Sequence, residues 1–465
     1  MRGEMATRAD GTTGPRPAGC PHPARPAPGD HGLGWNRTMG LFRSFGARAA
    51  EPKTGEPPAR AHPATTPLPV LTSLRFFAAF YVLVFHYDRF FFPDAPRHTV
   101  ILLGHTGVTF FFVLSGFILA YTYHAVDFGD RLVRRRYLWA RVSRVYPAFL
   151  LSLAISLPWF VAWVLKTEPP LKWLIASGAV LAPLGLHAWV PGAACSLNCA
   201  SWSISVEAFF YLLFPLLLPL VLRRPAEYAL AALGLWAVFG AFCTLLWSRY
   251  APGVSLIEPE PAGTMAVLLA QGIKYNPLLR LPEFIAGLVL FAGWRRMRRP
   301  ASEAQAATAR GRAGPFLAAA ALAALVLVVI EPYVPSPLMH NGLTVVAWAP
   351  LILAGADLRG GVLASAPLVF LGRISFALYL LHMPAYAVVN TLDRTLHGAI
   401  SGVSPWLAAG AATALSLAAA SLVHLAVEEP ARRVLLRRGL QAMLPALPSG
   451  STQAALHPPE SAGER

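Results

Sequence analysis

The chain has 465 residues, of which 55% are hydrophobic and only 13% are charged, about half the charged fraction of a typical soluble domain. This composition excludes a water-soluble globule, an intrinsically disordered chain and a disulfide-stapled secreted domain, since only 4 cysteines occur. Lys and Arg number 39 against 23 Asp and Glu, a net charge of +16 that indicates anionic partners. The basic residues gather in short blocks between apolar stretches, which is typical of membrane proteins and argues against nucleic acid as a partner.

Residues 1–66 are rich in Pro, Gly, Ala and Arg and have no apolar periodicity, so we predict a disordered cytoplasmic tail there. No apolar core of a signal peptide occurs in it, and the first hydrophobic run is expected to be a retained anchor. A true start at Met39 is an alternative.

Apolar stretches near the ~20 residues needed to cross a bilayer recur from Val70 onward. We expect ten spans, at 70–88, 104–123, 137–165, 203–222, 228–247, 279–294, 315–333, 341–357, 366–390 and 404–427. An eleventh stretch, 171–186, is short and interrupted by glycine and proline.

Orientation decides how the eleventh stretch is interpreted, because cytoplasmic loops carry the excess of Lys and Arg. With ten spans and a cytoplasmic N-terminus, every strong basic cluster falls inside, and a spanning 171–186 would reverse this for the rest of the chain. We therefore predict an all-α polytopic membrane bundle of about ten transmembrane helices plus one re-entrant or interfacial segment. The predicted membrane domain is 67–435, followed by a disordered tail at 436–465, with both termini in the cytoplasm and the lipid bilayer as a partner.

The predicted outer loop at 166–201 contains Cys195 and Cys199. A disulfide and two unpaired thiols are both compatible with this spacing.

The first span carries two ionisable residues, Arg75 and His86, and such residues inside a span by default mark function. At 100° per residue they return to within about 20° of one helix face, about 16 Å apart along the axis. Glu207 lies about one turn inside the fourth span, at a depth expected to match His86. A carboxylate that accepts an imidazole N–H strengthens the imidazole as a base, so we predict His86 and Glu207 as a catalytic pair. A structural hydrogen bond between two helices is the alternative.

Arg141 and Arg144 stand at i and i+3 where the third span begins, and two guanidinium groups on one face suit phosphate oxygens. Arg280 and Glu283 form another i, i+3 pair, for which a structural packing role is favoured. His105 and His340 receive no role from the sequence. No zinc-protease pair, phosphate-binding loop or hydrolase elbow occurs, so we expect no metal and no permanently bound cofactor.

The chain resembles acyltransferase family 3, multi-span bacterial membrane proteins that O-acylate sugars of surface polysaccharides and some antibiotics. The motifs that carry the resemblance follow in order: Leu-x-x-Leu-Arg with Arg75 and His86, 111–117, Arg141 with Arg144, 202–211, Arg280 to Phe284, 371–382 and 427–433. One position departs from the family, which commonly has a second glutamate where this chain has Ala208 after Glu207.

The resemblance implies an acyl-CoA-dependent O-acyltransferase in the cell membrane with acetyl-CoA as co-substrate and a carbohydrate acceptor. The CoA phosphates would contact Arg141 and Arg144 together with Arg75, and His86 would act as the base or carry the acyl group itself. The predicted substrate pocket consists of Ser115, Tyr211, Tyr379 and His382. A macrolide-type antibiotic acceptor and a transporter or flippase without acyl transfer are the alternatives, and the oligomeric state is not predicted.

Overall fold

A computed structural model describes residues 66–257, 263–298 and 313–443. All but the last residue of the tail predicted at 1–66, and most of the tail predicted at 436–465, lie outside these residues. Within the described part all regular secondary structure is helical, with no strand. The main helices are α2 (Pro69–Phe91), α3 (Thr99–Leu102), α4 (Gly107–Tyr123), α5 (Arg131–Lys166), α6 (Leu171–Leu181), α7 (Trp202–Arg223), α8 (Pro225–Tyr250), α9 (Thr264–Tyr275), α10 (Pro277–Met297), α12 (Ala313–Ile330), α13 (Ser336–Leu338), α14 (Val345–Asp357), α15 (Ala366–Thr395), α16 (Pro405–Val423) and α17 (Glu429–Ala442).

The all-α membrane fold predicted from the sequence is confirmed, because the described residues contain 10 helical segments long and apolar enough to cross a membrane. The sixth segment consists of α9 and α10, which meet where the Asn276 side chain accepts a hydrogen bond from the Leu278 amide at 2.9 Å. The stretch predicted not to span forms the short helix α6, with 11 residues. The last helix, α17, extends beyond the expected domain boundary at 435 and packs on α5, where the Trp139 indole donates to the Leu435 carbonyl at 2.8 Å.

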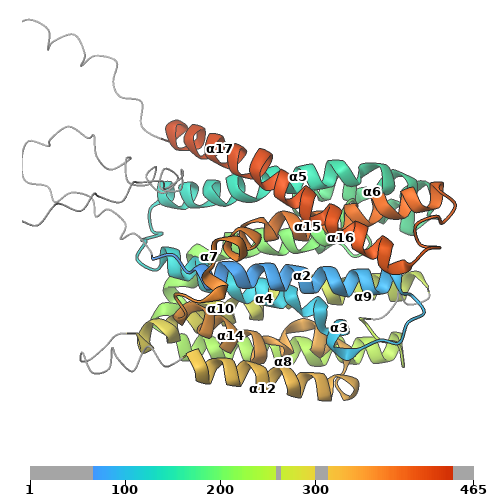
Figure 1. Ribbon diagram of the computed structural model, residues 1–465. Helices are drawn as coiled ribbons and strands as arrows, with labels where there is room; N and C mark the ends of the chain where they lie inside the picture. The colour runs from blue at the N-terminus through green and yellow to red at the C-terminus, as the bar shows by residue number, and fades with distance from the viewer. Residues whose placement is uncertain (1–65, 258–262, 299–312, 444–465) are drawn as a thin grey trace, which may run out of the picture. The chain divides into compact units, whose positions relative to one another are not determined.

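The helices run side by side, so the chain alternates between two ends of the bundle (Figure 1). One end carries the start of α5 and the ends of α7 and α10, with Arg131, Arg223 and Arg296, and is called the basic end below. The opposite end carries the segment between α6 and α7, in which Cys195 and Cys199 form a disulfide, and is called the disulfide end. This bond resolves the alternative that the sequence left open.

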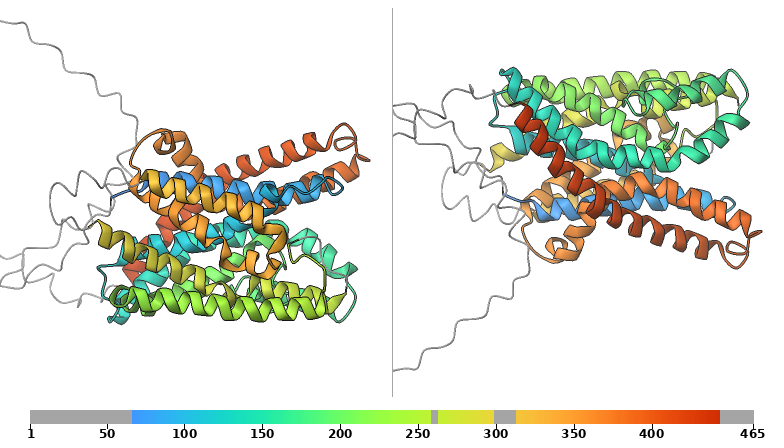
Figure 2. Two further views of the ribbon diagram at one scale, coloured as in Figure 1. Left: turned by 90° about the horizontal axis from the view of Figure 1, so that it is seen from below. Right: turned by 90° about the horizontal axis from the view of Figure 1, so that it is seen from above.

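Two pairs of helices cross with their backbones in contact, as small residues allow in membrane proteins. A Cβ atom on Gly287 of α10 would lie 2.1 Å from the Val113 carbonyl of α4. A Cβ atom on Gly372 of α15 would lie 1.9 Å from the Thr72 carbonyl of α2. Both views in Figure 2 show α2 beside α15, two helices that are almost 300 residues apart in the sequence. These crossings fix which side chains of the four helices can meet.

The Arg280–Glu283 pair is a buried ion pair, with 3.3 Å between guanidinium and carboxylate and 1% exposure of each side chain. Arg280 also donates to the Asn341 side chain at 2.7 Å, and Thr109 donates to Glu283 at 3.2 Å. The pair therefore ties α10 to α4 and to the segment before α14. An isolated charge at this depth would be costly, so these contacts support the structural role.

Candidate active site

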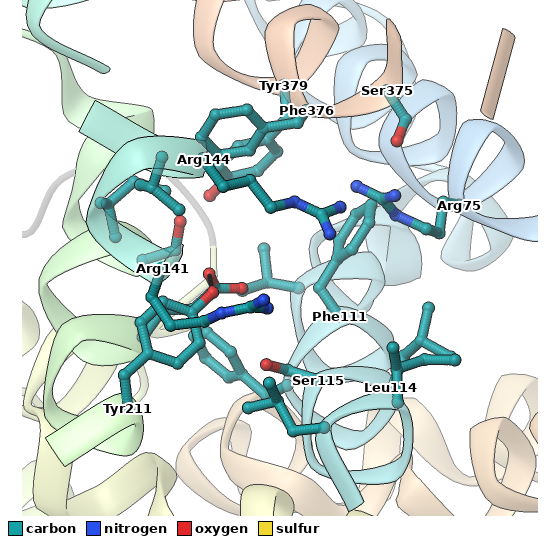
Figure 3. A pocket seen from close by; sticks show the side chains of 18 residues that line it. Arg75, Phe111, Leu114, Ser115, Arg141, Arg144, Tyr211, Ser375, Phe376 and Tyr379 are labelled. Atoms are coloured by element: carbon teal, nitrogen blue, oxygen red, sulfur yellow. Dashed lines mark hydrogen bonds between the residues drawn. The ribbon is translucent and has the colours of Figure 1, made fainter. Parts of the chain in front are cut away.

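Three arginines from two helices converge on one cavity, called the arginine cavity (Figure 3). Arg75 comes from α2, and Arg141 and Arg144 come from successive turns of α5. The remaining polar lining consists of Ser115 of α4, Ser203, Glu207 and Tyr211 of α7, and Ser375 and Tyr379 of α15. Among the described lining residues, three guanidinium groups thus face a single carboxylate. Helical spacing linked Arg141 to Arg144 and the family resemblance placed Arg75 with them, and in the structure all three line this cavity.

Aromatic rings hold Arg141 in place. Its guanidinium carbon lies 5.6 Å from the ring centre of Tyr123 and 5.9 Å from that of Tyr137. The same group donates to the Tyr123 hydroxyl at 3.2 Å. Cation–π contacts of this kind stabilise a cation where water is scarce.

Glu207 does not meet His86, which corrects the predicted pair. The Tyr211 hydroxyl donates to the Glu207 carboxylate at 2.5 Å, and both residues line the arginine cavity. The sequence-based prediction places the start of α7 at the membrane surface and Glu207 about one turn below it. In the structure the preceding segment folds into the bundle, where Ser196, Asn198 and Ser201 are at most 2% exposed. Helix α7 therefore starts deep, and Glu207 reaches the depth of the arginines.

His86 lines a second cavity, called the histidine cavity, towards the disulfide end. It is the larger of the two, about 460 Å³ against about 120 Å³. Its polar lining includes His86, Arg89, His105, Asn198, Lys274, Tyr275, His340 and Tyr379, together with Cys195 and Cys199. No carboxylate is present among the described residues that line it.

Two histidines of this cavity, His105 and His340, received no role from the sequence. Their rings stack at 5.1 Å with an interplanar angle of 14°. His105 Nδ1 lies 2.8 Å from the Leu102 carbonyl, whereas its buried Nε2 has no hydrogen-bond partner within the described chain. The sequence signal that could have pointed to His105 is its position at the start of the second predicted span, 104–123. Within the described ranges, no three His, Cys, Asp or Glu side chains are placed to hold a metal ion.

His86 is paired with another imidazole. His86 Nδ1 lies 2.9 Å from the Val82 carbonyl, one turn back on α2, and 3.2 Å from His382 Nε2 on α15. His382 Nδ1 lies 2.6 Å from the Tyr379 carbonyl. His382 is 1% exposed and lines neither cavity, so its predicted place in the substrate pocket is corrected. Ser115, Tyr211 and Tyr379 do line the arginine cavity.

The two cavities meet at Val108 of α4 and Tyr379 of α15, the two residues that line both. Both side chains are buried, at 6% and 7% exposure. The shortest route from the arginines to His86 inside the bundle therefore runs beside Val108 and Tyr379. This pair is called the junction below.

Together, the membrane-length helices and two adjoining polar cavities define a multi-pass membrane protein with an internal site. The chain belongs to acyltransferase family 3, because the family model described as "Acyltransferase domain" matches residues 69–425. The resemblance seen in the sequence is thereby confirmed, and the chain is a membrane acyltransferase.

Several relatives bear matching names. The chain is 30% identical over 399 residues to "Acyltransferase MdmB" of Streptomyces mycarofaciens, covering 81% of this chain and 94% of the relative. It is 24% identical over 351 residues to "Putative peptidoglycan O-acetyltransferase YrhL" of Bacillus subtilis (strain 168), covering 70% of this chain and 50% of the relative. It is 25% identical over 315 residues to "Putative membrane-bound transacylase BcsY" of Komagataeibacter xylinus, covering 64% and 70%. No solved structure matches the chain.

Proposed function

We propose that the protein is an integral-membrane O-acyltransferase that moves an acyl group, of acetyl size, from acyl-CoA to a sugar hydroxyl. The acceptor is a surface polysaccharide, a lipid-linked glycan or a glycosylated metabolite such as a macrolide-type antibiotic. The observation that carries this proposal is the His86 imidazole in a large cavity adjoining three buried arginines, within a chain of this family. Family membership disfavours the alternative of a transporter without acyl transfer.

The donor side of the reaction belongs to the arginine cavity. Phosphate groups carry the charge of acyl-CoA, and guanidinium groups bind phosphate through charge-assisted hydrogen bonds. Arg75, Arg141 and Arg144 are the proposed phosphate ligands, and the thioester extends from them past the junction towards His86. Arg75 and His86 lie about 16 Å apart along α2, at about 1.5 Å per residue, a span that an extended pantetheine arm covers.

The acceptor side belongs to the histidine cavity, whose larger volume and aromatic walls suit a sugar ring. His86 Nε2 removes the proton of the acceptor hydroxyl while its oxygen attacks the thioester carbonyl carbon. The tetrahedral intermediate collapses, the carbon–sulfur bond breaks, and the proton held by His86 passes to the CoA thiolate. The products are an ester and CoA with a free thiol.

A second route gives the same products. His86 Nε2 attacks the thioester first, CoA leaves, and the acceptor hydroxyl then takes the acyl group from the imidazole. Acetyl-CoA supplied without acceptor separates the two routes. A burst of about one free thiol per protein molecule indicates the acyl-enzyme, and the absence of a burst indicates direct transfer.

The test of the proposed function is His86→Ala in protein reconstituted into lipid nanodiscs. We expect acetyl transfer to fall at least ~100-fold, the usual contribution of a positioned base. His98→Ala is the matched control, since His98 is exposed at the disulfide end, and we expect it to retain full activity. Wild-type transfer rates in His86→Ala would refute the assignment.

The acceptor is identified by comparing a deletion strain with its parent. Mass spectrometry of surface glycans and secreted metabolites is expected to show one class of molecule that has lost an acetyl-sized or larger mass. The purified acceptor is then used in the acetyl-transfer assay described above.

A further inference from the structure

The partner of His86 differs from the carboxylate that commonly orients a catalytic histidine. Within the described chain, the hydrogen-bond partners of the His86 ring are the Val82 carbonyl and the His382 imidazole. The inference below rests on the proposed function, in which His86 is the base.

The hydrogen bonds assign the proton on each ring. A carbonyl oxygen only accepts, so His382 Nδ1, at 2.6 Å from the Tyr379 carbonyl, carries the proton. In a neutral imidazole the other nitrogen is then an acceptor, and His382 Nε2 presents its lone pair to His86. His86 Nδ1 faces that lone pair and the Val82 carbonyl, both acceptors, and therefore also carries a proton. His86 Nε2 is left unprotonated.

We propose that His382 is the positioning residue for the catalytic base, a neutral imidazole in the place usually taken by a carboxylate. Before reaction, its lone pair favours the His86 tautomer that is competent as a base. When His86 Nε2 takes the proton of the acceptor, the Nδ1–H bonds to His382 and to Val82 stabilise the imidazolium. Hydrogen bonds that strengthen as charge develops are those that accelerate a reaction.

The surroundings hold His382 rigidly enough for this role. The Tyr87 hydroxyl donates to the His382 carbonyl at 2.8 Å and lies 2.8 Å from the Ser416 hydroxyl. This contact joins α2, α15 and α16 one residue away from His86. The close crossing at Gly372 fixes α2 against α15 towards the basic end. A neutral partner also places no additional buried charge in the bundle, which a carboxylate would do.

Two substitutions distinguish orientation from packing. His382→Leu replaces the imidazole with an apolar side chain of similar size and removes the Nε2 lone pair. In His382→Gln the side-chain amide oxygen can still accept the hydrogen bond from His86 Nδ1–H. We expect kcat of His382→Leu to fall roughly 10–100-fold, with the KM values for acetyl-CoA and acceptor within about threefold of wild type. His382→Gln is expected to recover most of the lost kcat. Equal impairment of the two variants, or wild-type kcat in His382→Leu, would overturn the proposal.

A spectroscopic measurement tests the pairing independently of activity. In protein with ¹⁵N-labelled histidine, the His86 signals are identified as those lost in His86→Gln. We expect Nδ1 to be protonated and Nε2 to be unprotonated at neutral pH. The opposite tautomer would refute the proton assignment even if acyl transfer depends on His86. Conversely, full activity of His86→Ala would refute the proposed function and leave the observed tautomer intact.

Discussion

The arginine cavity places three guanidinium groups inside a membrane bundle, where unpaired charge is costly. Among the lining residues that the structure describes, Arg75, Arg141 and Arg144 share it with one carboxylate, Glu207, which is also hydrogen-bonded to Tyr211. Charges buried in a membrane protein are costly and are kept where they pair or bind a ligand. A cavity with an excess of cations is therefore best satisfied by an anionic ligand. Acyl-CoA, with several phosphate charges, supplies that anion in the proposed reaction.

Substitution of one arginine tests this interpretation. We expect Arg144→Ala to raise the apparent KM for acetyl-CoA roughly 10–100-fold, since a hydrogen bond to a charged group contributes about 1.5–3 kcal/mol. The KM for the acceptor should change by less than about threefold, because the proposed acceptor site lies beyond the junction. Initial rates over a matrix of both substrate concentrations measure the two constants together.

The control for this variant is Arg135→Ala, which removes an exposed arginine of the same helix, outside the cavity. Arg144 is a cleaner target than Arg141, since Arg141 also packs on the rings of Tyr123 and Tyr137. An unchanged requirement for acetyl-CoA in Arg144→Ala would count against the phosphate site.

The spans could be predicted from the sequence, because a bilayer demands ~20 apolar residues in every crossing helix. Composition thus determines their number and approximate bounds, and all ten are present. Helical spacing likewise predicted that Arg141 and Arg144 share a face, since both belong to one element. The contact between His86 and His382 joins residues almost 300 positions apart and depends on how α2 packs on α15. No local pattern carries that information.

The depth of Glu207 could not be predicted from the sequence, for a different reason. Residues 182–199 have the composition of a surface loop, with glycine, proline and two cysteines, but most of them fold inwards. Asn198 shows why this is possible, since its amide donates to the Leu380 carbonyl at 2.7 Å and its side-chain oxygen accepts from the Ala200 amide at 3.2 Å. Polar groups satisfied in this way can be buried, as loop groups normally cannot. Hydropathy alone does not detect such contacts.

The junction between α4 and α15 leads to a prediction about acyl length. If the acyl group reaches His86 past Val108 and Tyr379, the size of Val108 limits which chains fit. We expect Val108→Ala to raise kcat/KM for butyryl-CoA relative to acetyl-CoA about tenfold or more, because one methylene in a tight pocket is worth roughly 10–200-fold. Val108→Phe should depress transfer of every acyl group.

Ile118→Ala is the matched control for the junction, since Ile118 lines the arginine cavity and is absent from the lining of the histidine cavity. Competition between the two acyl-CoAs in one reaction, analysed by mass spectrometry of the products, measures the ratio directly. If the ratio of kcat/KM for butyryl-CoA to that for acetyl-CoA is unchanged in both Val108 variants, the acyl group does not pass Val108 and the prediction is wrong.

At the scale of the whole molecule, the arrangement separates a donor side from an acceptor side. Arg75 precedes His86 along α2, and Arg141 lies near the start of α5, so the arginine cavity is nearer the basic end. The disulfide lines the histidine cavity at the other end. Acyl-CoA is made in the cytoplasm and is too highly charged to cross a bilayer unaided. Disulfides persist in oxidising compartments outside the cytoplasm. Both considerations lead us to propose that the basic end is cytoplasmic.

This orientation predicts the labelling of two exposed positions by a membrane-impermeant maleimide. In a Cys20→Ser background, Asp94→Cys at the disulfide end should react in intact spheroplasts, whereas Arg135→Cys at the basic end should react only after permeabilisation. The remaining native cysteines interfere little, since Cys243 is buried and Cys195 is bonded to Cys199. Additional labelling after mild reduction is expected at the disulfide end. The reverse pattern would place the arginine cavity on the side that lacks acyl-CoA and would contradict both the orientation and the proposed direction of transfer, whatever the effect of His86→Ala.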